Sequence, residues 1–546
     1  MKKKFIIILF FLGINLRAQI SSKVELSDPI DSPLILSGNF GELRSSGFHT
    51  GIDIKTNGVE GINVRAIDSG YISRIGISTN GYGKVIYVNH KNNLTSVYAH
   101  LSGFGKKLKN IVRKLQYKNK KFELIKFFEK DKIKVSKAEI IGYSGNTGSS
   151  SGPHLHFEIR KSDEELPLNP LNFNYKIKDT IRPYIKNLFL YGYTNGILKK
   201  TKLYLKKLND STYKSNDVKT YDTIGFGVTT YDKKNFTNNI FGNHKYSLYI
   251  NDSLDFELIF DSFSFPEKSA QKKFIDNEYF TLNKSRIIKL FQNNDNNLSF
   301  ISSKGNGFIV NKSKDFVVKI KLSDVNKNNT YVVINVSGDE KNYKYDEDIV
   351  FPFNKILNPE KNYQLEFNNN KLIIDKNTFE KKSKILFDYK NDTLSVYNPY
   401  VNVLKNIKIK FFAQKNRNGQ FLSRKNFDGS SNFLTDKIID KYYNLKTKQL
   451  GKFYIDYDTI PPIIKRNKKF DYKKQIQYFI SDEKTGIKNY TVKINDRWAL
   501  FEYEPKFKKI FFKNDTLINN NQINKVYVEI EDLVGNRTTL IDYLKF

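Results

Sequence analysis

Short hydrophobic and β-branched runs, broken by turn residues, dominate the pattern of this chain. In its first third the clearest are 64–67, 70–75 and 84–88, and Asn80-Gly81 marks a turn between two of them. Runs of about five residues bounded by such turn residues are typical of β-strands. Few stretches show helical periodicity, so the pattern predicts a mainly β protein with an antiparallel sheet at its core.

One segment departs from this pattern. Hydrophobic residues recur at helical spacing from Leu108 to Leu115, and a second amphipathic piece follows over 122–128. We therefore expect an insertion at about 104–135 that forms a small helical or mixed lobe. It could contact glycan, regulate access to a cleft or cover an edge strand, and we favour the last of these roles.

The chain after residue 178 repeats itself. The segment 179–186 is echoed by 458–465, and the alternating run 316–322 is echoed by 526–530. Alternation of this kind is typical of half-buried strands in a β-sandwich. The sequence thus predicts two to three Ig-like β-sandwich modules behind the first domain. The expected division is a signal peptide at 1–19, a first domain at 20–178, a β-sandwich module at 179–340, a β module at 341–457 and a β-sandwich module at 458–546.

An Asp-x(3)-Asn pair follows each of the two echoed strands, at Asp324/Asn328 and Asp532/Asn536. Two oxygens in a turn fall far short of the six to eight ligands that Ca²⁺ takes. We interpret these pairs as turn-forming side chains.

The N-terminus predicts export. Met1 to Lys4 is positively charged, Phe5 to Ile14 is apolar, and Ala18 offers a small residue for cleavage. The apolar run is about half of the ~20 residues that a spanning helix needs, so we expect a removable signal and no transmembrane anchor afterwards. The predicted location is the periplasm, the cell envelope or the medium.

Composition narrows the possible partners. The 546 residues suit three to four domains, and the absence of cysteine excludes disulfides, thiolate metal ligands and a lipid-modified Cys. The net charge of +34 would indicate nucleic acid in a cytosolic protein, but the lysines are scattered along the chain as an AT-rich coding bias would place them. For an exported protein we expect no nucleic-acid partner, and an anionic envelope polymer suits the charge better.

Five of the six histidines fall within the first domain. His154 and His156 alternate on a predicted strand, so both project from one face, and His49 and Asp53 are spaced to converge as well. One imidazole of the pair, with His49 and Asp53, would give three N/O ligands and an open fourth position, which suits a catalytic zinc ion. The spacing does not decide which of His154 and His156 binds the metal.

The remaining histidines differ in what they could do. His100, at the tip of a predicted strand, could orient a metal-bound water, take its proton or hydrogen-bond an oxyanion. His90 lies beside a predicted hairpin turn and receives no role. His244 stands among polar residues, and we expect it at the surface.

Five blocks in order carry a resemblance to a known family. They are His49-x(3)-Asp53, 81–85, 98–101, 142–148 and 152–158. Together they resemble the M23 family of zinc metallopeptidases, of the LytM or lysostaphin type, over about residues 36–172.

The resemblance implies an antiparallel β-sheet metallopeptidase core with one Zn²⁺. Carried over by position, it implies His49, Asp53 and His156 as zinc ligands and His100 and His154 as catalytic residues. Its expected activity is that of an endopeptidase, in which a zinc-bound water attacks peptide bonds of peptidoglycan stem peptides or cross-links. The expected partners are peptidoglycan and, through the C-terminal modules, envelope proteins.

Two alternatives remain. A non-catalytic LytM-like protein would use the same groove to regulate or bind wall hydrolases or wall peptides, and an adhesin-like protein would act through the β modules. The five matching positions are all present, which favours an enzyme.

Overall fold

A computed structural model of the protein describes most of the chain. The described residues are 25–545, apart from short gaps at 46, 195–196, 269, 293–297, 303, 311–314, 340, 342, 347–350, 414–416, 469–474, 514–516 and 519–520. The predicted signal peptide, residues 1–19, lies outside them. Below, residues 25–178 are called the N-terminal body, 179–340 the first module, 341–457 the middle module and 458–545 the last module; these boundaries stay predictions.

An antiparallel sheet of nine strands forms the N-terminal body, with the order β1-β4-β13-β8-β7-β6-β10; β11 pairs with β6 and β14 with β13. The strands are β1 (Leu36–Gly38), β4 (Ile52–Lys55), β6 (Gly70–Ile77), β7 (Lys84–His90), β8 (Leu94–Ala99), β10 (Leu124–Phe127), β11 (Lys134–Val135), β13 (His154–Lys161) and β14 (Leu166–Leu168). A small sheet joins β5 (Asn63–Arg65), β12 (Ile140–Tyr143) and β9 (Gly103–Phe104).

Burial explains which way β13 faces. Leu155, Phe157 and Ile159 are fully buried in the main core of this body. Because side chains alternate along a strand, His154, His156 and Glu158 project from the opposite face of the sheet. Burial of one face of β13 in the hydrophobic core therefore directs both histidines to the other face.

The predicted insertion is confirmed as a mixed lobe. Helix α1 (Lys106–Asn119) buries Leu108 and Val112, and its end at Lys120 is left-handed, with φ 48°. The second amphipathic piece is not helical: it forms β10, which pairs with β6 and thereby covers the edge of the main sheet. The prediction of a mainly β fold with antiparallel sheets is likewise confirmed.

The first and last modules repeat one sheet. The order β26-β25-β21-β22 in the first matches β45-β44-β40-β41 in the last. These strands are β21 (Lys245–Ile250), β22 (Ser253–Ile259), β25 (Phe316–Ser323), β26 (Asn329–Gly338), β40 (Ile487–Ile494), β41 (Arg497–Trp498), β44 (Ile523–Asp532) and β45 (Arg537–Lys545). The hairpins β21–β22 and β40–β41 both turn at an Asn-Asp pair with positive φ. The angles are 45° and 62° for Asn251-Asp252 and 48° and 61° for Asn495-Asp496. Positive φ at both central residues is the backbone of a type I′ turn.

Further strands complete these two modules. The first module adds β15 (Tyr184–Thr194), β16 (Ile197–Leu203), β17 (Leu205–Lys207), β18 (Thr212–Ser215), β19 (Val218–Thr220), β20 (Thr223–Tyr231), β23 (Ile288–Lys289) and β24 (Ile309–Val310), with helices α2 (Phe265–Lys268), α3 (Gln271–Phe274) and α4 (Asn277–Asn283). The last module adds β38 (Ile463–Arg466), β39 (Gln475–Ser481), β42 (Glu502–Glu504) and β43 (Lys509–Lys513), with the 3₁₀ turn η2 (Pro505–Phe507).

The middle module packs two sheets over one core. One has the order β27-β30-β31-β37-β33-β34 and the other β28-β29-β32-β36-β35. Their bounds are β27 (Lys355–Leu357), β28 (Tyr363–Phe367), β29 (Asn370–Ile374), β30 (Ser383–Lys390), β31 (Thr393–Tyr397), β32 (Ile407–Phe412), β33 (Gln420–Lys425), β34 (Ser431–Thr435), β35 (Ile438–Ile439), β36 (Tyr442–Thr447) and β37 (Gly451–Tyr457).

The Asp-x(3)-Asn pairs form turns, as expected. The Asn328 backbone N–H donates to Asp324 Oδ1 at 2.8 Å, and the Asn536 backbone N–H donates to Asp532 Oδ1 at 2.9 Å. Each Asn side chain also donates to the other oxygen of its aspartate, at 2.7 Å. These hydrogen bonds close both turns.

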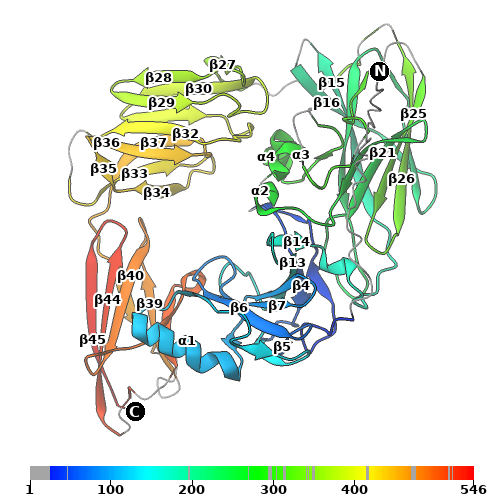
Figure 1. The fold of residues 1–546 in the computed structure, drawn as a ribbon. Coiled ribbons are helices and arrows are strands. Elements are labelled where there is room, and N and C mark those ends of the chain that lie inside the picture. Colours follow the sequence, from blue (N-terminus) through cyan, green and yellow to red (C-terminus); the bar gives the residue numbers. More distant parts are fainter. Residues whose placement is uncertain are drawn as a thin grey trace, which may run out of the picture.

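The four parts form a closed circuit (Figure 1), in which the last module returns to lie against α1 of the N-terminal body. Trp498 packs edge-on against Tyr117 of α1, with ring centroids 5.3 Å apart. The middle module contacts the first through Asn277 Nδ2, which donates to Tyr400 O at 3.0 Å. The hairpin of β2 (Leu43–Arg44) and β3 (Gly47–Phe48) joins the N-terminal body to the first module, because Phe48 is buried in that module's core.

Over the described ranges, we find no helix with the length and apolar character required to span a membrane.

Candidate active site

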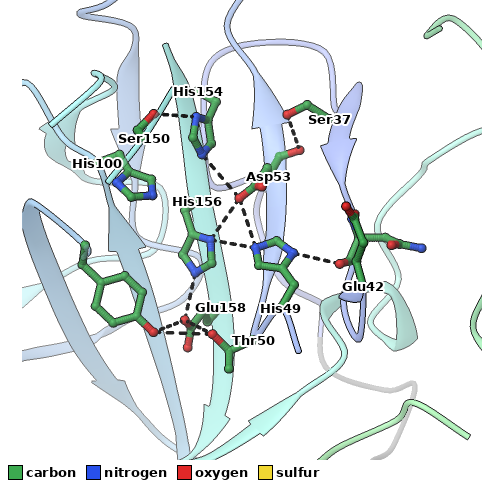
Figure 2. A network of polar contacts seen from close by, with 12 residues as sticks. Ser37, Glu42, His49, Thr50, Asp53, His100, Ser150, His154, His156 and Glu158 are labelled. Atoms are coloured by element: carbon green, nitrogen blue, oxygen red, sulfur yellow. Dashed lines mark hydrogen bonds and ion pairs between the residues drawn. The ribbon is translucent and has the colours of Figure 1, made fainter. Parts of the chain in front are cut away.

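Two adjacent strands bring the predicted ligands together. Strands β4 and β13 pair antiparallel with Asp53 opposite His156, and His49 lies just before β4 (Figure 2). His49 Nε2 is 3.0 Å from His156 Nδ1 and 3.2 Å from Asp53 Oδ1. His156 Nδ1 is 3.0 Å from Asp53 Oδ1. The three predicted ligand atoms therefore form one compact triangle.

In both imidazoles of this triangle, the nitrogen that faces away from Asp53 is hydrogen-bonded to an oxygen. His49 Nδ1 is 2.8 Å from the carbonyl oxygen of Asn39, and His156 Nε2 is 2.8 Å from Glu158 Oε1. These oxygens can only accept, so both nitrogens donate. In the neutral rings, His49 Nε2 and His156 Nδ1 then face Asp53 with lone pairs.

Three acceptors pointing at one spot require a cation between them. Burial opposes protonation of His156, but hydrogen bonds to Asp53 and Glu158 raise its pKa. A proton on His156 Nδ1 could therefore form a hydrogen bond to Asp53. That proton cannot at the same time satisfy His49 Nε2, and burial lowers the pKa of His49 to about 4, which keeps its ring neutral. A metal ion satisfies all three acceptors at once.

The donor set fits zinc. Two imidazole nitrogens and one carboxylate oxygen are ligands that Zn²⁺ accepts, and bonds of about 2.0–2.1 Å in a tetrahedron would place the ligand atoms about 3.3 Å apart. The observed separations of 3.0–3.2 Å are slightly shorter and need only small adjustments. Three protein ligands leave a fourth position open.

Arg44 fixes the second oxygen of the carboxylate. Its Nη2 lies 2.5 Å from Asp53 Oδ2, so Oδ1 alone is directed at the histidines. Burial favours a neutral carboxyl, but His49 and the other two imidazoles close to Oδ1, those of His154 and His156, hold the pKa of Asp53 well below its usual value. Asp53 therefore stays ionised.

His154 and His100 flank the triangle. His154 Nδ1 donates to Gly152 O at 2.8 Å, and its Nε2 lies 3.4 Å from Asp53 Oδ1. His100 Nδ1 donates to Thr147 O at 2.9 Å, and the two rings have centroids 4.9 Å apart. Burial, with a smaller effect of His156, lowers the pKa of His100 to about 3. His100 therefore keeps its Nε2 available as a proton acceptor, and the bond of His154 Nδ1 to Gly152 leaves His154 Nε2 near Asp53.

The loop of residues 144–152, called the glycine loop below, supplies the carbonyls that orient both of these rings. Gly148 is left-handed, with φ 71°, and a Cβ there would lie 2.4 Å from the backbone nitrogen of Gly83. His100 is itself left-handed, with φ 61°, where β8 ends. Its ring position therefore depends on tight local backbone geometry.

A buried network behind His156 escaped the sequence analysis. Glu158 is fully buried and accepts from Tyr82 Oη at 2.5 Å, Thr50 Oγ1 at 2.7 Å and Arg160 Nε at 2.7 Å. Glu158 follows His156 by two residues on β13, so strand alternation was a sufficient signal that both share a face. Arg44 and Asn39 offered no such local signal.

The two remaining histidines lie elsewhere. His90 ends β7 and contacts Ser96 Oγ at 2.6 Å, away from the triangle. His244 was expected at the surface, but its side chain is only 15% exposed and its Nε2 lies 2.8 Å from Asp261 Oδ1. The polar residues around His244 in the sequence gave no indication of this contact.

The comparisons with known proteins concern this part of the chain. The model of Peptidase family M23 matches residues 47–117 and 119–170. The DD-carboxypeptidase/endopeptidase Mpg of Neisseria meningitidis is 34% identical over 124 residues, which are 23% of this chain and 22% of that protein; the Neisseria gonorrhoeae protein of the same name gives the same values. The chain thus matches only about a fifth of the length of these curated relatives.

A solved structure is similar to part of this chain. The catalytic domain of the antimicrobial peptidase lysostaphin from Staphylococcus simulans is 28% identical, with 23% of this chain and 80% of that chain covered and a TM-score of 0.18. The matched segment contains the whole triangle together with His100 and His154. The N-terminal body of this chain carries a peptidase domain of family M23.

Proposed function

We propose that the protein is an exported, zinc-dependent peptidase that hydrolyses peptide bonds of peptidoglycan stem peptides or cross-links. The observation that supports a bound metal ion is the triangle of three facing acceptors, His49 Nε2, Asp53 Oδ1 and His156 Nδ1. When bound, Zn²⁺ would supply Lewis-acid chemistry, which lowers the pKa of a water and polarises a carbonyl.

His100 and His154 would perform the proton transfers. Each donates its Nδ1–H to a carbonyl of the glycine loop, so the neutral form of each ring carries its lone pair on Nε2. Such a nitrogen can accept the proton of the attacking water. Once protonated, it can donate to the leaving amine or hydrogen-bond the oxyanion formed on the attacked carbonyl.

Two further groups hold the constellation. Glu158 fixes the ring of His156 from behind, and Arg44 fixes the free oxygen of Asp53. Outer partners of this kind are usually needed for full metal affinity.

The substrate and the location are inferred from the N-terminus and from the similarity to a curated relative. The N-terminal charge and apolar run favour export, and the similarity to a DD-carboxypeptidase/endopeptidase supports a peptide substrate of the cell wall. The last three parts of the chain would serve for spacing or docking to the envelope.

One experiment tests this function. The full chain without residues 1–19 is incubated with peptidoglycan sacculi, after chelation and again after zinc is added back, and released fragments are identified by mass. We expect cleavage that disappears with the chelator and returns with zinc. Intact sacculi under all conditions would exclude the enzyme and favour the non-catalytic binder.

Two variants separate the predicted roles. His156→Ala should lose zinc, measured by metal analysis after dialysis. His154→Ala should retain zinc while cleavage falls by about 10²–10⁴-fold, the usual contribution of a general acid–base group. Loss of zinc from His154→Ala would reverse the assignment within the pair.

A further inference from the structure

The last module touches the peptidase domain beside the catalytic histidines, although more than 350 residues separate the partners in sequence. Within this module, the contacts described here come from one short segment, Trp498 to Lys506, which includes β42 and η2. They reach the glycine loop, β7 and α1.

Lys506 of η2 binds the glycine loop directly. Its Nζ lies 3.0 Å from Asn146 Oδ1 and 2.9 Å from Ser150 O, and it also bonds to Asn146 O. A lysine ammonium has three N–H groups, and three oxygens accept them here. The ammonium therefore bridges the two sides of the loop and is not left to bind a substrate carboxylate.

The bridged residues flank the carbonyl that orients His100 and contact the one that orients His154. Thr147, whose carbonyl accepts from His100 Nδ1, lies between Asn146 and Ser150. Ser150 Oγ is 2.7 Å from Gly152 O and 3.2 Å from His154 Nδ1. Movement of this loop would thus misalign both rings at once.

A second contact acts on the same loop through Lys84. Glu502 Oε2 lies 2.7 Å from Lys84 Nζ, and both side chains are largely buried, at 18% and 7% exposed. The backbone N–H of Lys84 donates to Thr147 Oγ1 at 2.9 Å. The ion pair therefore also fixes a residue that holds the loop.

We propose that the last module is part of the catalytic unit, with Lys506 as a positioning residue that orders the glycine loop and thereby aligns His100 and His154. This inference rests on the proposed peptidase function for its kinetic consequence, but its structural consequence can be measured without activity. Because much of the Lys506 side chain is exposed, its effect on global stability should be small.

The test uses the full mature chain and three variants. Lys506→Met removes the ammonium and keeps most of the length of the side chain, and Lys506→Arg restores a cation. Lys465→Met removes an exposed lysine of β38 in the same module as a matched control. Hydrogen–deuterium exchange is measured for peptides that cover the glycine loop, in which the Ser149 N–H donates to Gly81 O at 2.9 Å.

We expect loop exchange at least about threefold faster in Lys506→Met, unchanged in Lys465→Met and largely restored in Lys506→Arg. With soluble cross-linked muropeptides, kcat of Lys506→Met should fall about tenfold, since misplaced catalytic groups lose rate. KM and the zinc Kd should stay within twofold of wild type.

The outcomes are distinguishable. Unchanged exchange of the glycine loop in both Lys506→Met and the double variant Lys506→Met/Glu502→Gln would overturn the positioning role, whatever the activity. Faster exchange together with an inactive wild-type protein would refute the peptidase function and leave the ordering of the loop standing. Faster exchange with an unchanged kcat would refute the link to the catalytic rings.

Discussion

Replacing Glu158 by Gln should weaken zinc binding without touching a ligand. Glu158 is fully buried, and its Oε1 accepts the Nε2–H of His156 at 2.8 Å. Glutamine has the same shape but no charge, and its NH₂ group cannot face Arg160 without setting two donors against each other. Either orientation of the amide leaves His156 or Arg160 with a poorer partner.

Glu158→Gln should have two measurable effects, one on zinc affinity and one on stability. Loss of an outer partner of a metal-binding histidine typically costs 10–100-fold in affinity, which is about 1.4–2.7 kcal/mol. The Arg160 side chain is only 3% exposed, and the removal of its buried carboxylate partner should destabilise the N-terminal body by about 3 kcal/mol. For a body of this size, that corresponds to a Tm about 6–12 °C lower.

The assay is a competitive zinc titration against a chromogenic chelator, done well below the unfolding temperature, together with thermal unfolding of the metal-free protein. Glu165→Gln is the matched control, because Glu165 Oε2 also pairs with Arg160, at 3.2 Å, but is 52% exposed and does not contact His156. A zinc Kd within twofold of wild type in Glu158→Gln, with only the Tm lowered, would refute the argument that Glu158 orients the metal ligand.

Three further changes have defined outcomes. Gly38→Ala would place a Cβ 2.2 Å from Arg44 Nη2 and 2.7 Å from Asp53 Oδ2, so zinc should bind about tenfold more weakly; an unchanged titration would contradict this. Burial raises the pKa of Asp232 to about 7, so its contribution to stability is present below about pH 4 and is lost as the pH rises through 7. Asp232→Asn should therefore raise the Tm at pH 8, with a gain that fades toward pH 4; an equal gain at both values would exclude titration as the cause. Val112→Ala in α1 should cost about 2 kcal/mol in unfolding free energy, measured with urea, and a cost below 0.5 kcal/mol would show that the inserted lobe does not share the core.

Much of the fold followed from local patterns. The alternation in β13 and β25 predicted strands with one buried face, and the core positions Leu155 and Ile320 agree with it. The segment 122–128 was harder, because Leu124 alone of β10 is buried and the strand is specified by its pairing with β6. A short amphipathic run does not reveal such a tertiary partner.

The candidate site divides in the same way. His49, Asp53 and His156 could be grouped because strand geometry limits where their side chains point. Glu158 was within reach of the same argument. Arg44, Lys84 and Lys506 were not, since their roles depend on contacts between segments whose approach is set by the packing of whole modules.

Because the chain closes on itself, the last module is a tethered binding partner of the N-terminal body. Because the segment is tethered through two intervening modules, its meeting with the glycine loop is intramolecular and does not depend on protein concentration. The contacts of Lys506 and Glu502 can therefore be individually weak and still stay formed. Cutting the chain between the middle and last modules, at about residues 457–458, would convert this into an ordinary bimolecular encounter, in which the separated last module can dissociate on dilution. Cleavage at that boundary would thus lower the proposed peptidase activity without altering any residue of the active site.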